Sequence, residues 1–202
     1  MDDTKDWWDV ACNSDGSLLA AVVKGQKLWY KASGVWTETA FDNANKIVWQ
    51  AVATDPVGDY IVASTFESIQ NGNVFLFHGP SFSTFVRINS VFNGLAAYTL
   101  SMNANYILAA EFNQGSNVHV AVLNNGNPTD FEAKNVPGAS GRFRDCFIAE
   151  NNVMAVADDD TGGKISISTD SGGTWTAVSN DQASDGKWNG ITTNGLATRY
   201  YA

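Results

Sequence analysis

A unit of between forty and fifty residues recurs along the 202 residues of this chain. Its clearest copies begin at Trp8, with the sequence WDVACNSDGSLLAAVV, and at Trp49, with the sequence WQAVATDPVGDYIVAST. Weaker copies begin near Ala97, Phe143 and Trp188. Repetition at this period is typical of folds that stack similar supersecondary units, because one unit alone cannot bury its apolar face. The chain is therefore expected to fold as a series of small, similar units.

Each unit reads as four short β-strands separated by turns. In the first unit we expect strands at 10–12, 18–23, 27–30 and 35–39, with a turn at 14–16. Gly, Asn, Ser and Thr fill the connections between strands throughout the chain. No segment shows the 3.6-residue periodicity of an amphipathic helix. The sequence therefore predicts an all-β fold.

The most specific motif lies in the fourth unit, where the residues from Ser168 to Trp175 read STDSGGTW. These residue types suit a tight turn. The Asp170 carboxylate can accept hydrogen bonds from turn amides, Gly172 can adopt a positive φ, and Trp175 can fill a seam between neighbouring sheets. Thr174 completes the pattern S-x-D-x-G-x-T-W, which the other units keep only in part.

This pattern resembles the Asp box of the sialidase-like (BNR) repeat β-propellers, and the longer unit resembles the repeats of bacterial and algal propeller proteins. The resemblance implies four-stranded blades, with the box on an outer hairpin away from the ligand channel and therefore in a structural role. We predict a single β-propeller domain over 1–202 with four near-complete blades and a partial fifth. The approximate limits are 7–46, 47–94, 95–141, 142–187 and, for the partial blade, 188–202.

The partial fifth blade is the candidate partner surface. Its sequence supplies only two strands, and an unfinished blade exposes an unpaired edge that proteins usually cover. Trp188, Tyr200 and Tyr201 are the candidate edge residues. Three explanations stay open: a fragment of a longer propeller, a ring closed by another subunit, or an open stack covered by partners. The second and third are favoured together, because Met1 resembles a natural start.

Composition narrows the classes of partner. The formal net charge is −9 and the pI is near 4.5, whereas nucleic-acid binding needs a basic face. We therefore expect no nucleic-acid partner. No apolar stretch is long enough for a membrane span, and the acidic N-terminus lacks the apolar region of a signal peptide. The compartment is left open.

Enzymatic activity is not expected, and no catalytic residue is predicted. Sialidases need an arginine triad in six blades, whereas this chain holds four arginines and is too short. Acidic residues on the loops between the second and third strands of each blade form a candidate ligand face. They are Glu67, Glu111, Asp158, Asp159 and Asp160. For the acidic run at 158–160, a solvated turn is favoured over a Ca²⁺ loop.

Cofactor chemistry is likewise not expected. His78 and His119 have no Cys or His at ligand spacing, so no metal site is predicted. Cys12 and Cys146 occupy equivalent positions of inner strands and are expected to be buried, reduced thiols. No phosphate-binding or dinucleotide-binding glycine motif occurs.

Aromatic residues are the remaining candidates for binding. Trp7-Trp8, Trp29-Tyr30 and Tyr200-Tyr201 could stack on sugar rings, although alternation along strands favours packing in the core. The preferred hypothesis is a non-enzymatic binding or scaffolding module within a larger assembly, such as a virion, a cell-surface structure or a multi-subunit complex. Its partner is a protein or a second copy of the chain. The alternatives are a glycan-binding propeller lectin and, third, a degenerate sialidase-like glycosidase.

Overall fold

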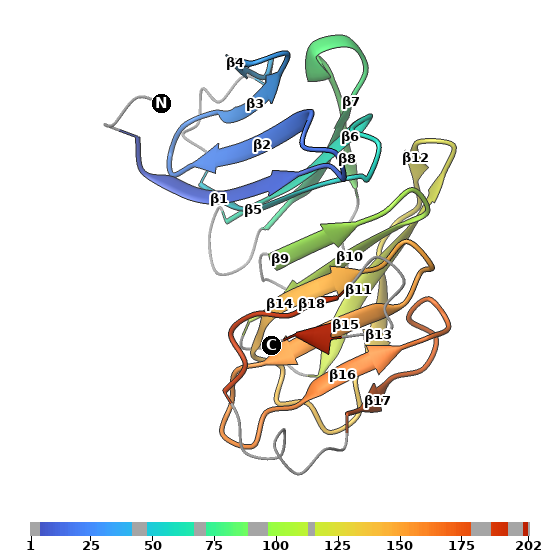
Figure 1. Ribbon diagram of the computed structural model, residues 1–202. Helices are drawn as coiled ribbons and strands as arrows, with labels where there is room; N and C mark the ends of the chain where they lie inside the picture. The colour runs from blue at the N-terminus through green and yellow to red at the C-terminus, as the bar shows by residue number, and fades with distance from the viewer. Residues whose placement is uncertain are drawn as a thin grey trace. The chain divides into compact units, whose positions relative to one another are not determined.

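The computed structural model describes residues 5–41, 48–66, 72–88, 97–112, 116–178, 187–193 and 200–201. Two compact units divide the chain, residues 1–97 and residues 98–202. Each unit holds antiparallel sheets whose strands are short (Figure 1).

The first unit contains two four-stranded sheets. The first sheet consists of β1 (Trp7–Cys12), β2 (Leu18–Val23), β3 (Leu28–Ala32) and β4 (Val35–Glu38). The second sheet consists of β5 (Trp49–Thr54), β6 (Tyr60–Thr65), β7 (Val74–His78) and β8 (Thr84–Ile88), with the short 3-10 helix η1 (Pro80–Phe82) between β7 and β8. β5 packs against β1 and β2, so the two sheets lie face to face.

The second unit repeats this arrangement. The third sheet consists of β9 (Ala97–Met102), β10 (Tyr106–Glu111) and β11 (Asn117–Asn124), with an outer strand in two pieces, β12 (Asn127–Pro128) and β13 (Glu132–Asn135). The fourth sheet consists of β14 (Phe143–Ile148), β15 (Met154–Asp158), β16 (Ile165–Ser168) and β17 (Thr176–Ala177). A strand pair follows, formed by β18 (Thr192–Thr193) and β19 (Tyr200–Tyr201).

The all-β prediction is confirmed. In each of the four sheets, consecutive strands pair in sequence order, as in the repeated units expected from the sequence. The second strand of the first sheet, Leu18–Val23, has the predicted limits. The single domain over 1–202 and its blade limits stay predictions.

The inner strands share an irregularity near their start. The register shifts between Trp7 and Asp9 in β1, between Trp49 and Ala51 in β5, and likewise at the start of β14. Side chains of a regular strand point alternately to the two sides of the sheet. A bulge at this position takes the side chain of the third residue out of this alternation. The repeat is therefore structural as well as sequential.

The four outer hairpins also share one backbone device. Each contains two consecutive residues with positive φ: Ser33-Gly34, Ser81-Phe82, Asn125-Gly126 and Ser171-Gly172. Such a pair matches the right-handed twist of a hairpin, and glycine adopts it without strain. Phe82 takes the glycine position at φ 48°, and its ring packs edge-on against Tyr30 at 5.0 Å. Burial of this ring between two sheets offsets the backbone strain.

Aromatic rings dominate the core of the first unit. Phe41 contacts Trp49, Phe75, Phe77 and Phe85, with ring centroids 4.8 to 5.8 Å apart. Trp49 is fully buried, and its indole N–H donates to the Gln26 carbonyl at 2.9 Å. This bond ties the start of β5 to the turn after β2.

The second unit has two apolar layers. One lies between the third and fourth sheets and includes Leu108, Val118, Cys146, Met154 and Trp175. The other covers the opposite face of the fourth sheet, where Ile191 and Trp188 pack against β15 and β16. The residues that begin the predicted fifth blade therefore bury the last four-stranded sheet.

Candidate functional site

The predicted Asp-box residues form the turn that joins β16 to β17. The Asp170 carboxylate accepts the Thr174 N–H at 2.7 Å, the Thr174 hydroxyl at 2.8 Å and the Ser168 hydroxyl at 2.8 Å. The Gly172 N–H donates to the Ser168 hydroxyl oxygen at 2.8 Å, and Gly172 has φ 87°. Trp175 is buried in the layer between the third and fourth sheets. All of these contacts serve the turn and its packing.

These hydrogen bonds set the charge state of the turn. The Thr174 N–H, followed by the Thr174 and Ser168 hydroxyls, lowers the pKa of Asp170 from 3.8 to about 2. Asp170 is therefore ionised across the ordinary pH range.

Glu111, a candidate ligand-face residue, is not a loop residue. It ends β10 and is buried, and its carboxylate lies 2.8 Å from Nε2 of His119 on β11. Both side chains are less than a tenth exposed. The expected role of Glu111 on an open loop is therefore wrong, because a cross-strand partner draws it into the sheet. Glu67 lies outside the described residues.

Two of the three carboxylates in the acidic turn at 158–160 are buried. Asp158 is 1% exposed, and its carboxylate accepts both the N–H and the hydroxyl of Ser140 at 2.6 Å. Asp159 is buried and accepts Nε–H of Arg144 at 2.7 Å. This hydrogen bond lowers the pKa of Asp159 and raises that of Arg144. The prediction of a solvated turn is therefore wrong for Asp158 and Asp159, since bonds within the fold satisfy their carboxylates, whereas the Asp160 side chain is 42% exposed.

Two arginines at the start of β14 link the third and fourth sheets. Arg144 donates to the Tyr98 hydroxyl at 2.8 Å and lies over the Phe112 ring at 4.4 Å. Arg142 lies 5.0 Å from the same ring, and its guanidinium is 3.9 Å from Asp159 and from Asp160. Tyr98 stacks on Phe112 at 5.1 Å. The sequence analysis predicted the acidic residues as candidates, but it missed the stack of arginine and aromatic side chains that contacts them.

The predicted edge residues lie beside or within the last strand pair. Trp188 is half-buried against the fourth sheet, and its backbone N–H donates to the Asp158 carbonyl at 3.3 Å. Tyr200 and Tyr201 form β19 and pair with Thr193 and Thr192. The side chains of both tyrosines lie outside the described part of the chain.

An aspartate clasp between successive sheets was missed by the sequence analysis. The clasp consists of Asp9 and Asp145, each the third residue of an inner strand. The Asp9 carboxylate accepts the N–H of Val10 on its own strand and of Val52 on β5, both at 2.8 Å. The Asp145 carboxylate accepts the N–H of Cys146 at 2.9 Å and of Ile191 at 2.8 Å.

Burial is the main influence on the clasp in the second unit. It raises the pKa of Asp145, whereas the hydrogen bonds from Ile191, Cys146 and Thr99 act in the opposite direction. The signal available in the sequence was an aspartate three residues into an inner strand, in W-W-D and F-R-D. A carboxylate at this position can accept N–H groups from two strands at once, because the bulge leaves these groups accessible to it.

The outward side of β1 is the most unusual surface of the first unit. Val10 is 61% exposed, whereas the fourth residues of the inner strands β5, β9 and β14, namely Val52, Leu100 and Cys146, are 4%, 7% and 4% exposed. Trp8 is 48% exposed and Cys12 is also exposed. The expectation that Cys12 is buried is therefore wrong, because no described residue of the first unit covers this side of its inner strand.

This surface continues across the first sheet. Pairing aligns Val10 with Ala21 and Trp29, and Cys12 with Leu19, Lys31 and Trp36, so both rows share one side of the sheet. We name this side the free face and define it by five residues. They are Trp8, Val10, Cys12, Trp29 and Trp36.

Tryptophans and lysines shape the free face. Lys24 lies 5.2 Å from the Trp8 ring and Lys5 lies 4.7 Å from the Trp29 ring, which are cation–π distances. Trp7 contacts Trp36 with ring centroids 5.6 Å apart. A cavity of about 270 Å³ opens between Trp7, Trp8, Asp9, Val10 and Ala21. The free face is thus apolar and hollowed, with a lysine over two of its indole rings.

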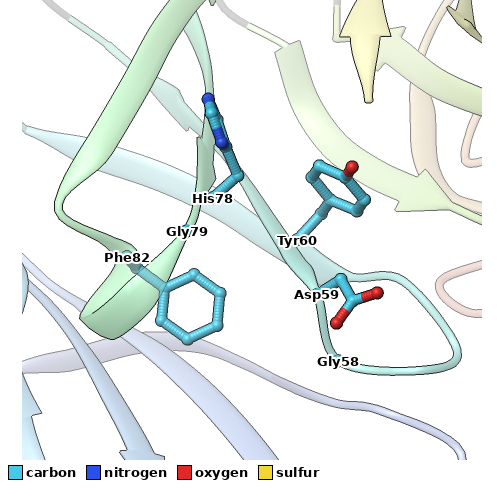
Figure 2. Close-up of a pocket in the computed structure, with 6 residues that line it drawn as sticks. All are labelled: Gly58, Asp59, Tyr60, His78, Gly79 and Phe82. Atoms are coloured by element: carbon cyan, nitrogen blue, oxygen red, sulfur yellow. The ribbon is translucent and has the colours of Figure 1, made fainter. Parts of the chain in front are cut away.

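A second cavity lies in the second sheet, where β6 begins and β7 ends. It has a volume of about 310 Å³ and is lined by side chains of β6 and β7, their flanking glycines and Phe82 (Figure 2). Figure 2 shows the Asp59 carboxylate, the Tyr60 ring and the His78 ring around it. Its size suits a small ligand, and it is the one described feature that bears on the glycan-binding alternative.

Two absences concern the described residues alone. Among them, no group of three or more His, Cys, Asp or Glu side chains could hold a metal ion. The same part of the chain contains no helix with the length and apolarity of a transmembrane segment.

The fold defines the class of this protein: it is an all-β chain built from repeated four-stranded antiparallel sheets. No family model and no curated protein matches the sequence. Among solved structures, a chain in the "Crystal Structure of Mitotic Checkpoint Complex" is similar, with a TM-score of 0.67 and 11% identity. The match covers 92% of this chain and 52% of that chain, so this chain spans about half the length of its structural neighbour. At this identity the likeness shows the fold alone.

Proposed function

We propose that this protein is a non-enzymatic binding and scaffolding module that works within a larger protein assembly through its free face. One observation carries the proposal: Val10 is 61% exposed, whereas the equivalent residues of the inner strands β5, β9 and β14 are at most 7% exposed. The covering layer that each of those strands has is absent from the described residues around β1. An assembly partner supplies that layer.

The composition of the free face supports this role. Tryptophan is enriched in protein interfaces, where it offers a large contact area with few rotatable bonds, and contiguous exposed apolar patches mark interaction surfaces. Lys5 and Lys24 cover two of the indole rings and keep them partly shielded when the partner is absent. Covering the face would contribute about 25 cal/mol for each Å² of apolar surface removed from water.

The fold is consistent with such a role. We propose that the sheets are blades of a β-propeller, a fold that often presents surfaces to protein partners. The similar solved structure is, by its title, part of a complex. We also propose membership of the Asp-box propellers, which is supported by the hydrogen-bonded turn around Asp170.

The proposal is tested with a photo-crosslinker attached to Cys12. Cys146 is 4% exposed and stays unlabelled, so the native chain takes the probe on the free face alone. The control carries Cys12→Ser and Val57→Cys, because Val57 is 69% exposed and lies in the turn between β5 and β6. We expect a defined protein adduct from Cys12 that Val10→Lys abolishes. Equal adducts from both positions, or none from Cys12, contradict the proposal.

A further inference from the structure

The cavity where β6 begins and β7 ends gathers polar groups that the fold itself does not use. Its lining consists of Gly58, Asp59, Tyr60, His78, Gly79 and Phe82 (Figure 2). The Asp59 carboxylate, the Tyr60 hydroxyl and the His78 imidazole make no hydrogen bond or ion pair within the described part of the chain. By contrast, the carboxylates of the aspartate clasp and of Asp170 accept N–H groups. The three groups in the cavity are therefore available to a ligand.

The lining residues depart from the pattern of the repeat. The first residue of the second strand of each sheet pairs with a residue of the third strand, and in the second sheet this pair is Tyr60 and His78. In the other sheets the same pair is Leu18–Ala32, Tyr106–Val122 and Met154–Ser168. Phe82 departs as well, because it holds a positive φ where the other outer hairpins have glycine. Backbone strain of this kind is concentrated at ligand sites.

The charge of the cavity favours a cation. Asp59 is exposed, and none of the six lining residues is a lysine or an arginine that could balance its carboxylate. Asp55, at the start of the same turn, senses this charge: burial raises the pKa of Asp55, and the charge of Asp59 raises it further. A ligand carboxylate or phosphate would be repelled here, and a neutral sugar would leave the charge of Asp59 unbalanced. A cation would neutralise it.

The second unit shows which cation a similar set of side chains holds. Arg144 donates its Nε–H to the Asp159 carboxylate at 2.7 Å and another N–H to the Tyr98 hydroxyl at 2.8 Å. The guanidinium of Arg144 also lies 4.4 Å from the centre of the Phe112 ring. A carboxylate, a phenol and a phenyl ring thus hold one guanidinium, because this planar group donates in several directions and stacks on aromatic faces.

The cavity presents the same three groups, in Asp59, Tyr60 and Phe82, without an arginine of its own. Figure 2 shows these side chains spread apart around the cavity. The ring of His78 lies beside that of Tyr60, with centroids 6.3 Å apart. The volume of about 310 Å³ leaves room for a guanidinium and for part of the carbon chain that carries it.

We propose that this cavity binds a guanidinium group from outside the chain, carried by a small guanidine or by an arginine side chain of another protein. Asp59 pairs with the N–H groups of the ligand, Tyr60 accepts a further N–H, and aromatic rings of the lining pack against its planar face. The cavity shares no residue with the free face, so this inference does not rest on the proposed function.

Titration with ethylguanidinium tests the site, followed by the amide chemical shifts of the ¹⁵N-labelled chain. We expect the amides of residues 58–60 and 78–79 to shift and to saturate below about 10 mM. Ethylurea has the same shape without the charge and should bind at least about tenfold more weakly, because charge-assisted hydrogen bonds are the stronger ones. Absence of saturation, or equal binding of ethylurea, overturns the inference.

Two further ligands test the chemical class. Ethylammonium carries the charge without the planar fork of donors, so it should also bind more weakly than ethylguanidinium. Equal binding of ethylammonium overturns the assignment of a guanidinium. Methyl glucoside should leave the same amides unshifted. If methyl glucoside saturates them and ethylguanidinium does not, the cavity is a sugar site and the inference is wrong.

Matched variants locate the binding. Asp59→Asn should weaken binding of ethylguanidinium at least about tenfold, and Tyr60→Phe should weaken it about threefold through loss of one acceptor. The Asp59 side chain makes no hydrogen bond in the described chain, so Asp59→Asn should keep the fold, which circular dichroism verifies. The control is Glu150→Gln, which removes an exposed carboxylate of the second unit and should bind like the native chain. Native affinity in Asp59→Asn overturns the inference.

A short peptide distinguishes the two sources of the guanidinium. Acetyl-Gly-Arg-Gly-amide is compared with ethylguanidinium and with the same peptide carrying citrulline in place of arginine. A peptide at least about tenfold tighter than ethylguanidinium identifies an arginine side chain as the ligand, and equal affinity identifies a small guanidine. Equal affinity of the arginine and citrulline peptides overturns the inference. Each of these results leaves the proposed function untouched, since crosslinking from Cys12 tests the free face alone.

Discussion

At the scale of single residues, Asp170 shows how one side chain can order a turn. Its carboxylate receives the N–H and the hydroxyl of Thr174 and the hydroxyl of Ser168. The adjacent Gly172 lies so close to Val120 that an added Cβ would stand 3.0 Å from its methyl group. The turn therefore fixes both its own backbone and its approach to the third sheet.

The charge of Asp170 predicts a pH dependence of stability. The folded pKa, about 2, lies below the ordinary value of 3.8, so ionised Asp170 stabilises the fold above pH 3.8. This contribution is lost as the pH falls from 3.8 through 2. We expect Asp170→Ala to lower the free energy of unfolding at pH 7, and the difference from the native chain to shrink towards pH 2.

Urea unfolding at several pH values between 2 and 7 measures this difference. Asp130→Ala is the matched control, because Asp130 is exposed and its backbone carbonyl, not its carboxylate, accepts the neighbouring Thr129 hydroxyl. A constant difference between Asp170→Ala and the native chain over this range would show that the carboxylate charge is not responsible.

At the scale of elements, the aspartate clasp explains how successive sheets are held in register. In β1 and β14 the third residue is an aspartate, Asp9 or Asp145. One of its carboxylate oxygens accepts the N–H of the next residue in its own strand, and the other accepts the N–H of Val52 or Ile191. In the third sheet the same position is Thr99, whose hydroxyl lies 3.3 Å from the Asp145 carboxylate. Polar links of this kind fix the spacing of faces that apolar packing alone would let slide.

Removing the Asp145 carboxylate should loosen the attachment of Ile191 and β18 to the fourth sheet. Asp145→Ala leaves the N–H groups of Cys146 and Ile191 without their acceptor, which costs about 1–3 kcal/mol of unfolding free energy. We also expect amide hydrogen exchange at Ile191 to accelerate, measured by mass spectrometry of the native chain and the variant.

Glu150→Ala provides the control for this change. Glu150 is an exposed carboxylate in the turn between β14 and β15. Its removal should leave both the free energy of unfolding and the exchange at Ile191 unchanged. Equal exchange at Ile191 in Asp145→Ala and the native chain would show that packing of Ile191, and not the clasp, holds β18.

At the scale of the whole molecule, the free face couples stability to association. Each unit has its own apolar core, so the free face is not needed to keep the first unit folded. Covering it adds stability only when a partner is bound. A partner that binds the native state alone therefore stabilises it by mass action.

The midpoint of thermal unfolding should consequently rise when the protein captured through Cys12 is added. For the native chain we expect a rise of about 3–5 °C for each tenfold increase in the concentration of that protein above its dissociation constant. The Val10→Lys chain should show one midpoint at all concentrations of that protein. Differential scanning calorimetry measures both. A native midpoint that is independent of this concentration would contradict binding through the free face.

Local features could be predicted from the sequence because their causes are local. The strand Leu18–Val23 follows from an apolar run between turns, and the turn around Asp170 follows from residues within four positions of each other. Burial of Glu111 could not be predicted, because its partner His119 comes within reach only through the pairing of β10 with β11, which sets His119 opposite Ala109, two residues before Glu111.

The sequence by itself determined that this chain is all-β, repeated and rich in tight hairpins, because alternation, glycine and asparagine act within a few residues. Only the tertiary structure decided which strand faces are covered. Val10 and Val52 occupy the same position of the same repeat, yet one is exposed and the other is buried. The physical reason is that burial depends on the sheet that packs against a strand, and the sequence near a strand does not say which sheet that is: the first sheet covers Val52, whereas no described residue of the first unit covers Val10.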